Sequence, residues 1–390
     1  MKFVNIVVLI LLLKVCPCIA AQMIDLPVDQ EAFFKKHIDS IELYLYIDDS
    51  INFISPAINQ LKHLQLLKLA GYYSDVTIPL ELLTLPKLQS LYVINLQMRL
   101  PAGIEVNQIQ SNIETLYYDR IGNNDALLLT SLPQLQQLFI DIYWTIGHSD
   151  SENLRPGMIV VENVDLSLFL NSLPNLRKLH ITNRGPMTID PSICTLINLE
   201  ELKLRMPYSL LPDCLNQLTN LRSMSVTTCS RNLRHEVDTN LSIVASLPNL
   251  ESLTLWTNLW LEMPDASYGF NKLQELTLDK NPVLDYLVYD ICPNDYYNSD
   301  AKSNINAVVT YLNLKKIVFE KEWLYNLPCQ VYTSFYSFID AFIRHIDAAW
   351  NEGMVNQLEQ IMVGDDVLWQ RPSSREMSGN MVPANWKAQE

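Results

Sequence analysis

The residue types that most often carry out chemistry are present in this chain, but they do not gather into a recognisable site. The 390 residues include six histidines and seven cysteines, and no histidine shares a short stretch with other candidate metal ligands. His148 lies near Asp150 in a polar stretch whose composition is that of a loop. The sequence contains no P-loop, no HExxH, no GxSxG and no CxxC pattern. We therefore expect a protein that is not an enzyme and that holds neither a metal nor a cofactor.

The charge balance disfavours one large class of partner. The chain has 43 acidic and 28 basic residues, for a net charge of −15. An acidic surface of this size repels nucleic acid and anionic lipid. Apolar residues make up 48% of the chain and charged residues 18%, so a large core can be buried. We expect a folded protein that does not bind nucleic acid.

The N-terminal segment has the layout of a secretory signal. A basic residue, Lys2, precedes an apolar run at residues 3–13, Lys14 closes the run, and small residues follow at 18–21. We predict that residues 1–21 are a signal peptide, and that its removal makes the chain two charges more negative. The alternative is an uncleaved anchor, although the apolar run is short for a bilayer. No later segment is apolar enough to cross a membrane, so we expect no stable membrane insertion after cleavage.

A six-residue pattern, LxxLxL with conservative replacements, recurs along the chain, and most copies begin 22 to 25 residues after the preceding one. Several copies follow a Leu-Pro lead-in, as at Leu85-Pro86 and Leu247-Pro248. Degenerate copies occur at Ile38–Leu43 and Leu314–Phe319. The nine clear copies are Leu64–Leu69, Leu88–Val93, Ile113–Tyr118, Leu135–Ile140, Leu176–Ile181, Leu199–Leu204, Leu221–Val226, Leu250–Leu255 and Leu273–Leu278.

The spacing within the pattern predicts a strand. Its last two apolar residues are two positions apart, which places both on one face of a strand and the residue between them on the other. A single copy cannot bury its apolar edge, so neighbouring copies must stack and their strands must align in a parallel sheet.

This repeat resembles that of the leucine-rich-repeat family over about residues 38–319. The resemblance implies an α/β repeat solenoid, with a curved parallel β-sheet on the concave face, short helices or turns on the convex face, and a role in protein binding. In the family, Asn or Cys stands three residues after the last strand leucine, where its side chain satisfies backbone groups. Cys229, Asn258 and Asn281 occupy this position here, but several other copies lack it, so we expect a less regular N-terminal half.

After residue 319 the pattern changes. Apolar residues at helical spacing in Ser334–Ile346 predict an amphipathic helix, with a second helix at Asn351–Met362. The predicted organisation is a signal peptide at 1–21, an N-terminal cap with a degenerate repeat at 22–60, leucine-rich repeats at 61–281, a terminal repeat with a C-terminal helical cap at 282–364, and a flexible tail at 365–390.

Two polar insertions interrupt the rhythm, at residues 147–153 and 229–236. Insertions in solenoids form surface loops, which either border the binding face or have no role in binding.

Five cysteines follow the signal, so an oxidising compartment would leave one without an intramolecular partner. The resemblance implies a Cys292–Cys329 disulfide, because cap cysteines of secreted family members flank the terminal repeat. Cys194 and Cys214 lie in equivalent stretches of adjacent repeats and either meet across the stack or remain free thiols. Asn240 begins the only glycosylation sequon, which is usable in a eukaryotic host.

The middle residues of the repeats form a predicted binding face. Aromatic residues are followed along it by a basic cluster that includes Lys178 and Arg184, and this contrast is typical of binding surfaces. The outward residues that we expect to bind are Tyr92, Tyr117, Phe139, His180, Lys203, Arg205 and Trp256. A second outward row is expected to contain Ile94, Asp119, Asp141, Thr182, Arg205, Thr227, Trp256 and Asp279.

These observations favour a secreted module that binds another macromolecule, most simply a protein, through the concave sheet. It would be extracellular, or periplasmic or at the cell surface in a bacterium. The alternatives are a receptor-like ectodomain held by an uncleaved signal and an enzyme whose chemistry lies in the C-terminal segment.

Overall fold

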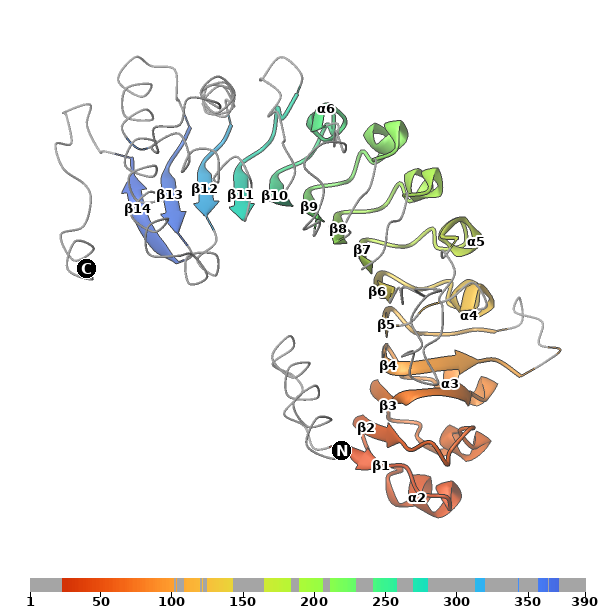
Figure 1. Cartoon of the computed structure of the whole chain (residues 1–390). Coiled ribbons are helices and arrows are strands. Elements are labelled where there is room, and N and C mark those ends of the chain that lie inside the picture. The colour runs from red at the N-terminus through yellow and green to blue at the C-terminus, as the bar shows by residue number, and fades with distance from the viewer. Residues whose placement is uncertain are drawn as a thin grey trace, which may run out of the picture. The chain divides into compact units, whose positions relative to one another are not determined.

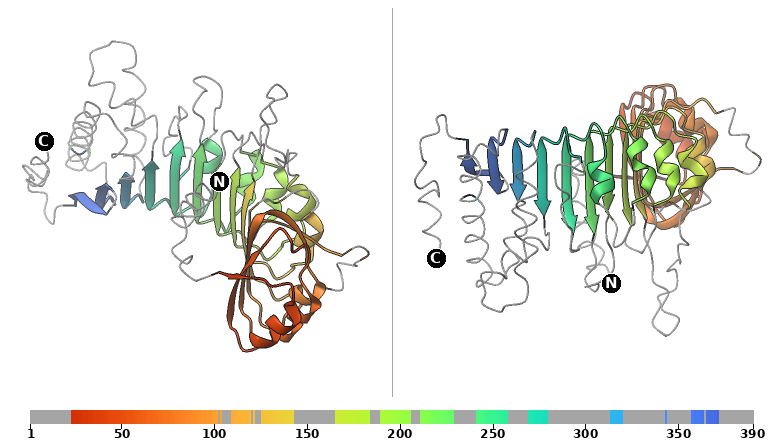
Figure 2. Two further views of the ribbon diagram at one scale, coloured as in Figure 1. Left: turned by 60° about the horizontal axis from the view of Figure 1, so that its bottom comes forward. Right: turned by 90° about the horizontal axis from the view of Figure 1, so that it is seen from above.

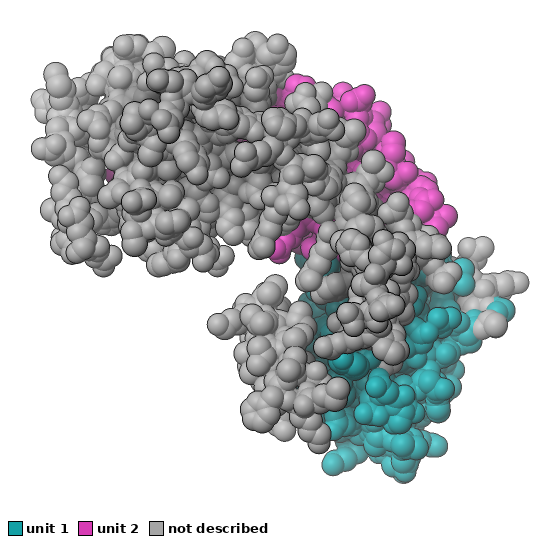
Figure 3. All heavy atoms as spheres, in the orientation of Figure 1, with its two compact units in different colours: residues 1–141 teal, residues 142–390 magenta. Residues whose placement is uncertain are grey.

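The structure is a computed structural model that describes residues 23–101, 103, 109–119, 121, 125–142, 165–183, 189–205, 211–228, 241–257, 269–279, 313–319, 343, 357–363 and 365–371. The chain divides into two compact units, unit 1 at residues 1–141 and unit 2 at residues 142–390 (Figure 3).

Unit 1 is a parallel sheet whose strands follow one another in chain order, with short helices on one side of the strands (Figure 1). Its elements are β1 (Ile24–Asp25), α2 (Gln30–Lys36), β2 (Glu42–Ile47), η2 (Pro56–Gln60), β3 (Leu66–Thr77), α3 (Leu80–Leu83), β4 (Ser90–Arg99), β5 (Thr115–Asp119), α4 (Ala126–Thr130) and β6 (Gln137–Ile142).

Unit 2 continues the same alternation, and Figure 2 shows its strands side by side. Strands β7 to β13 pair in parallel and in chain order, and β14 pairs antiparallel with β13. Its elements are α5 (Ser167–Leu170), β7 (Lys178–Asn183), η5 (Pro191–Thr195), β8 (Glu201–Arg205), η6 (Asp213–Gln217), β9 (Ser223–Thr228), α6 (Leu241–Ala245), β10 (Ser252–Thr257), β11 (Glu275–Asp279), β12 (Lys316–Phe319), β13 (Gln360–Val363) and β14 (Asp366–Gln370).

The repeat pattern accounts for these strands. Leu67 and Leu69 in β3 are fully buried, and Leu202 and Leu204 hold the same positions in β8. In β6 and β7 buried residues alternate with partly exposed ones, as the spacing predicts. The prediction of a parallel sheet of repeated strands with short helices is therefore confirmed.

The predicted register of the first degenerate copy is wrong by two residues. Leu43 pairs with Leu67, and Leu45 pairs with Leu69, so Leu43 holds the middle apolar position rather than the last. Ile38 and Ile41, which we expected to be apolar anchors, are 44% and 56% exposed. The two-residue periodicity of a strand keeps the same face buried after such a shift, so alternation alone does not fix the register.

A further copy of the repeat lies where a second helix was predicted. Ile361 and Val363 in β13 pair with the equivalent apolar residues of β12, so Leu358–Val363 is an LxxLxL copy. The spacing of Leu358, Ile361 and Met362 also fits a helix, and that coincidence misled the prediction. Strand β14 lies inside the segment 365–390 that was expected to be a flexible tail, so the tail prediction is wrong for residues 366–370.

Several predictions lie outside the described residues. They are the signal peptide, the insertions at 147–153 and 229–236, the ladder residues Cys229, Asn258 and Asn281, and the amphipathic helix at Ser334–Ile346, of which only Ile343 is described.

An asparagine ladder at a different position joins neighbouring repeats. The side chain of the Asn that directly precedes an LxxLxL copy donates a hydrogen bond to a backbone carbonyl of the preceding repeat, as Asn198 Nδ2 does to Pro174 O at 2.9 Å and Asn220 Nδ2 to Ile197 O at 2.9 Å. These bonds satisfy carbonyls at the turn into each strand. The other donors are Asn112, to Pro86 O; Asn249, to Thr219 O; and Asn313, to Asn271 O.

Unit 1 contains a buried polar group that replaces an aliphatic core residue. Tyr118 stands at the last apolar position of its repeat and is fully buried. Its hydroxyl donates to Asp125 Oδ1 at 2.9 Å and accepts the backbone N–H of Met98, also at 2.9 Å. Burial, reinforced by the charge of Asp125, raises the pKa of the Tyr118 phenol well above its ordinary value, so the hydroxyl remains a proton donor.

Candidate interaction surface

The outward side chains of the strands, here called the outward strand face, form rows across each unit because the strands pair in register. In unit 1 the central row places Tyr92 beside Tyr117, and Tyr117 beside Phe139. The rings of Tyr92 and Tyr117 stack with centroids 6.1 Å apart and planes 21° apart. The sequence-based grouping of these three aromatic residues thus corresponds to adjacent positions on the sheet.

Sequence reasoning missed two members of this row. Register places Tyr44 of β2 beside Lys68 of β3, and Lys68 beside Tyr92. Lys68 is only 6% exposed. Tyr44 was missed because the predicted copy Ile38–Leu43 ends before it. In the observed register Tyr44 lies between the two strand leucines, at the middle position of the repeat. Lys68 holds the middle position of a clear copy and was identifiable by the same criterion as Tyr92.

In unit 2 the outward strand face carries a charged cluster centred on Glu201 of β8. Glu201 Oε1 lies 2.6 Å from Lys203 Nζ and 3.0 Å from His180 Nε2, and its Oε2 lies 3.6 Å from Lys178 Nζ. We define the Glu201 cluster as these four residues together with the exposed Arg205 of the same strand. Sequence analysis identified the cations but not the carboxylate that holds them.

The pKa values of this cluster reflect its shared charges. Burial lowers the pKa of His180, and the Lys203 ammonium lowers it further against the opposing effect of Glu201. Burial acts to raise the pKa of Glu201, but the hydrogen bond and charge of Lys203, together with His180, outweigh it and leave the pKa lowered. Glu201 is therefore ionised at neutral pH, and its charge is retained among several cations.

The second outward row departs from expectation. Asp119 is only 2% exposed and Thr227 only 7% exposed, so neither presents its side chain at the surface. The Asp119 carboxylate is bound to the backbone of the preceding repeat, because its Oδ1 accepts the N–H of Asn95, whose φ of 54° is left-handed. The backbone of Trp256 lies in β10 beside Thr227, and its side chain is outside the described part of the structure.

The structure joins Cys194 of η5 to Cys214 of η6 in a disulfide, with Cα atoms 5.9 Å apart. It therefore links the helical turns of two adjacent repeats on unit 2. Cys292, Cys329 and the sequon residue Asn240 lie outside the described residues.

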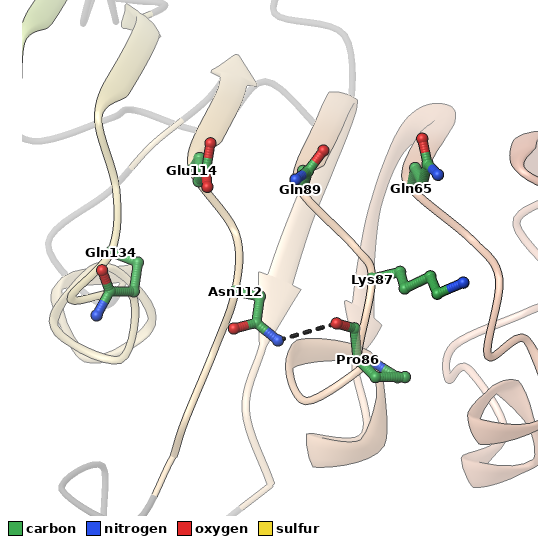
Figure 4. Close-up of a pocket in the computed structure, with 7 residues that line it drawn as sticks. All are labelled: Gln65, Pro86, Lys87, Gln89, Asn112, Glu114 and Gln134. Atoms are coloured by element: carbon green, nitrogen blue, oxygen red, sulfur yellow. Dashed lines mark hydrogen bonds between the residues drawn. The ribbon is translucent and has the colours of Figure 1, made fainter.

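A polar hollow of about 430 Å³ lies near the N-terminal ends of strands β3 to β5 (Figure 4). Its lining is dominated by amide side chains such as Gln65, Gln89 and Asn112, of which Asn112 donates to Pro86 O at 3.1 Å. Within the described ranges, no three His, Cys, Asp or Glu side chains are placed to share a metal ion. In the same ranges no helix has the length and apolar character needed to span a bilayer.

No curated protein matches the chain. Among solved structures, an internalin from Listeria monocytogenes is similar, with 16% identity, a TM-score of 0.43, and coverage of 85% of this chain and 84% of that one. A plant peptide hormone receptor in complex with its ligand shows 17% identity, a TM-score of 0.33, and coverage of 72% of this chain and 36% of that one. A leucine-rich-repeat protein of Leptospira interrogans shows 16% identity, a TM-score of 0.30, and coverage of 76% and 86%.

The family described as leucine-rich repeat region matches residues 37–287, which is more than half of the sequence. Its span covers β2 to β11 and every clear copy of the repeat. The chain therefore belongs to the leucine-rich-repeat family.

Proposed function

We propose that this chain is a secreted, non-catalytic binding protein that recognises another protein through its outward strand face. The observation that carries the proposal is the register of the strands. It makes neighbours of Tyr92, Tyr117 and Phe139 in unit 1, and of His180 and Lys203 in unit 2, although these residues are far apart in sequence.

Three physical properties of the sheet and its side chains support this choice of surface. Repeat solenoids typically bind proteins through the extended sheet that their strands form. Aromatic and arginine side chains contribute most to binding energy when a partner desolvates them. A row of such side chains on a hydrogen-bonded sheet is also rigid, so little conformational entropy is lost when a partner binds.

Secretion is part of the proposal. The sequence of residues 1–21 supports it, and so does the Cys194–Cys214 disulfide, because such bonds persist mainly in oxidising compartments. Mass spectrometry of protein recovered from the medium tests this point. We expect the chain to begin close after Ala20 or Ala21, and recovery of an intact Met1 would contradict cleavage.

Site-specific photocrosslinking tests the choice of surface. A photoreactive phenylalanine analogue replaces Tyr92, Tyr117 or Phe139 on the outward strand face. In matched controls it replaces Leu127 of α4 or Leu168 of α5, which are 46% and 47% exposed on the helices. We expect crosslinks to an extracellular protein from the strand positions only. Crosslinks that arise mainly from the helix positions would overturn the assignment.

A further inference from the structure

We propose that the Glu201 cluster binds an acidic segment of the partner protein, and that Glu201 occupies the place of a ligand carboxylate until the partner binds. This inference rests on the proposed function, because it names the chemistry of the partner at one part of the outward strand face.

Positive charge exceeds negative charge at the centre of the cluster. Lys178 and Lys203 are permanent cations, and both pair with the single carboxylate of Glu201. The chain as a whole has a net charge of −15, so this local excess of positive charge stands out from the rest of the molecule. Charge complementarity of this kind selects partners and fixes their orientation.

The Glu201 cluster differs from the other ion pairs described on unit 2. Arg177 pairs with Glu200 at 2.5 Å, Arg222 with Glu251 at 2.7 Å, and Lys316 with Glu275 at 3.4 Å. Each of these is one cation with one carboxylate. Glu201 instead lies within 4 Å of three basic side chains. Its single negative charge is shared among them and does not balance their positive charge.

The lysines of the cluster are more accessible to solvent than Glu201 is. The side chains of Lys203 and Lys178 are 49% and 43% exposed, whereas that of Glu201 is 19% exposed. An ammonium group has three donor hydrogens, so each lysine can bind an incoming carboxylate on its exposed side. Glu201 competes for the same donors, and its removal should therefore strengthen binding of an acidic ligand.

A short acidic protein segment fits this surface better than nucleic acid does. The cluster spans two strands, β7 and β8, and so offers only a few cations to a polyanion. Nucleic acid is bound through many phosphate contacts, and the strongly acidic remainder of the chain would repel the rest of the strand.

Fluorescence anisotropy with labelled hexaglutamate and the full chain at low ionic strength tests the proposal. We expect Lys203→Gln and Arg205→Gln each to weaken binding about fivefold or more, and Glu201→Gln to strengthen it about twofold or more. Lys316→Gln and Glu251→Gln are the matched controls, because they make the same charge changes at one-to-one pairs of unit 2, and they should bind like the parent. Circular dichroism melts establish that each variant is folded.

Three results would overturn the proposal: hexaglutamine binding as tightly as hexaglutamate, equal binding by the parent and the Lys203→Gln variant, or Glu201→Gln failing to strengthen binding. Tighter binding of a decathymidylate would assign the cluster to nucleic acid instead. If hexaglutamate does not bind while photocrosslinks still arise from Tyr92 and Tyr117, only this inference is wrong. If the crosslinks arise from the helices, the proposed function falls as well.

Discussion

Units 1 and 2 use one backbone plan to present different chemistry. The central outward row of unit 1 is aromatic apart from one lysine. That of unit 2 begins with a histidine and a lysine, continues with three hydroxyl side chains and ends with two apolar ones. The rows are Tyr44, Lys68, Tyr92, Tyr117 and Phe139 in unit 1, and His180, Lys203, Ser225, Thr254, Thr277, Val318 and Met362 in unit 2.

The units also differ in how they reinforce the repeats away from this face. Unit 1 buries the Tyr118–Asp125 hydrogen bond in its core, and unit 2 joins two helical turns through Cys194–Cys214. The leucines that build the sheet are the same in both. This difference shows that the conserved spacing of the leucines fixes the position of each side chain on the sheet. The types of the outward residues, which vary between the units, then determine what each unit can bind.

The largest expected effect is on the stability of unit 2. The Cys194–Cys214 disulfide closes a 20-residue separation, which corresponds to about 3 kcal/mol in the chain-entropy model. The double variant Cys194→Ser with Cys214→Ser should therefore lower the free energy of unfolding by about that amount. Urea denaturation of the parent under non-reducing conditions provides the comparison. An unchanged midpoint would show that the bond contributes nothing to the fold.

A smaller loss is expected in the core of unit 1. Tyr118→Phe removes the hydroxyl and leaves the buried Asp125 carboxylate and the Met98 N–H without this partner, at a cost of about 2 kcal/mol. Tyr117→Phe, at the neighbouring outward position, is the control and should change stability by less than about 0.5 kcal/mol. Thermal melts compare the stability of the two variants. Similar losses of stability in both would contradict a special role for the buried hydroxyl.

The asparagine ladder should contribute equally to both units. Asn112→Ala in unit 1 and Asn220→Ala in unit 2 each remove one side-chain bond to the preceding repeat, and each should cost about 1 kcal/mol. Denaturation curves for both variants measure this directly. A loss confined to one unit would show that the ladder is not a common element of the repeats.

The smallest effect concerns the charge of His180. Because Lys203 lowers and Glu201 raises the pKa of this histidine, Lys203→Gln should raise it and Glu201→Gln should lower it. Titration of the imidazole followed by NMR gives both values in the folded protein. Shifts of the same sign in the two variants would be incompatible with the geometry of the Glu201 cluster.

Much of this fold is predictable from the sequence, because the spacing of the LxxLxL leucines determines both the strands and the outward positions. That spacing alone is sufficient to place Tyr92, Tyr117 and Phe139 in one row of the sheet, and the strand register agrees. It fails where two patterns fit equally well, as at Leu358–Val363, whose apolar residues suit a helix or a strand until the neighbouring strand β12 supplies a partner.

The candidate site is less predictable than the fold, since it depends on partners rather than on spacing. Glu201 stands one position from a core leucine and has no special sequence context, yet its carboxylate organises the cations around it. Asp119 was expected to face outward, but a hydrogen bond from Asn95 holds it in a buried position. Sequence reasoning did not single out the Asn that directly precedes several copies of the repeat, and only the structure shows the carbonyls to which it donates.

The central claim is that the outward strand face carries the binding, and one paired measurement tests it most directly. With the protein captured by photocrosslinking as ligand, calorimetry compares the parent, a face variant (Tyr117→Ala with Arg205→Ala) and a deletion of His148–Asn153 in the first insertion. Truncation of an aromatic or arginine at a contact centre commonly costs about 2 kcal/mol or more, so the face variant should remain folded and bind at least about thirtyfold more weakly. The deletion should bind like the parent. A face variant that binds like the parent, together with a deletion that abolishes binding, would contradict the account.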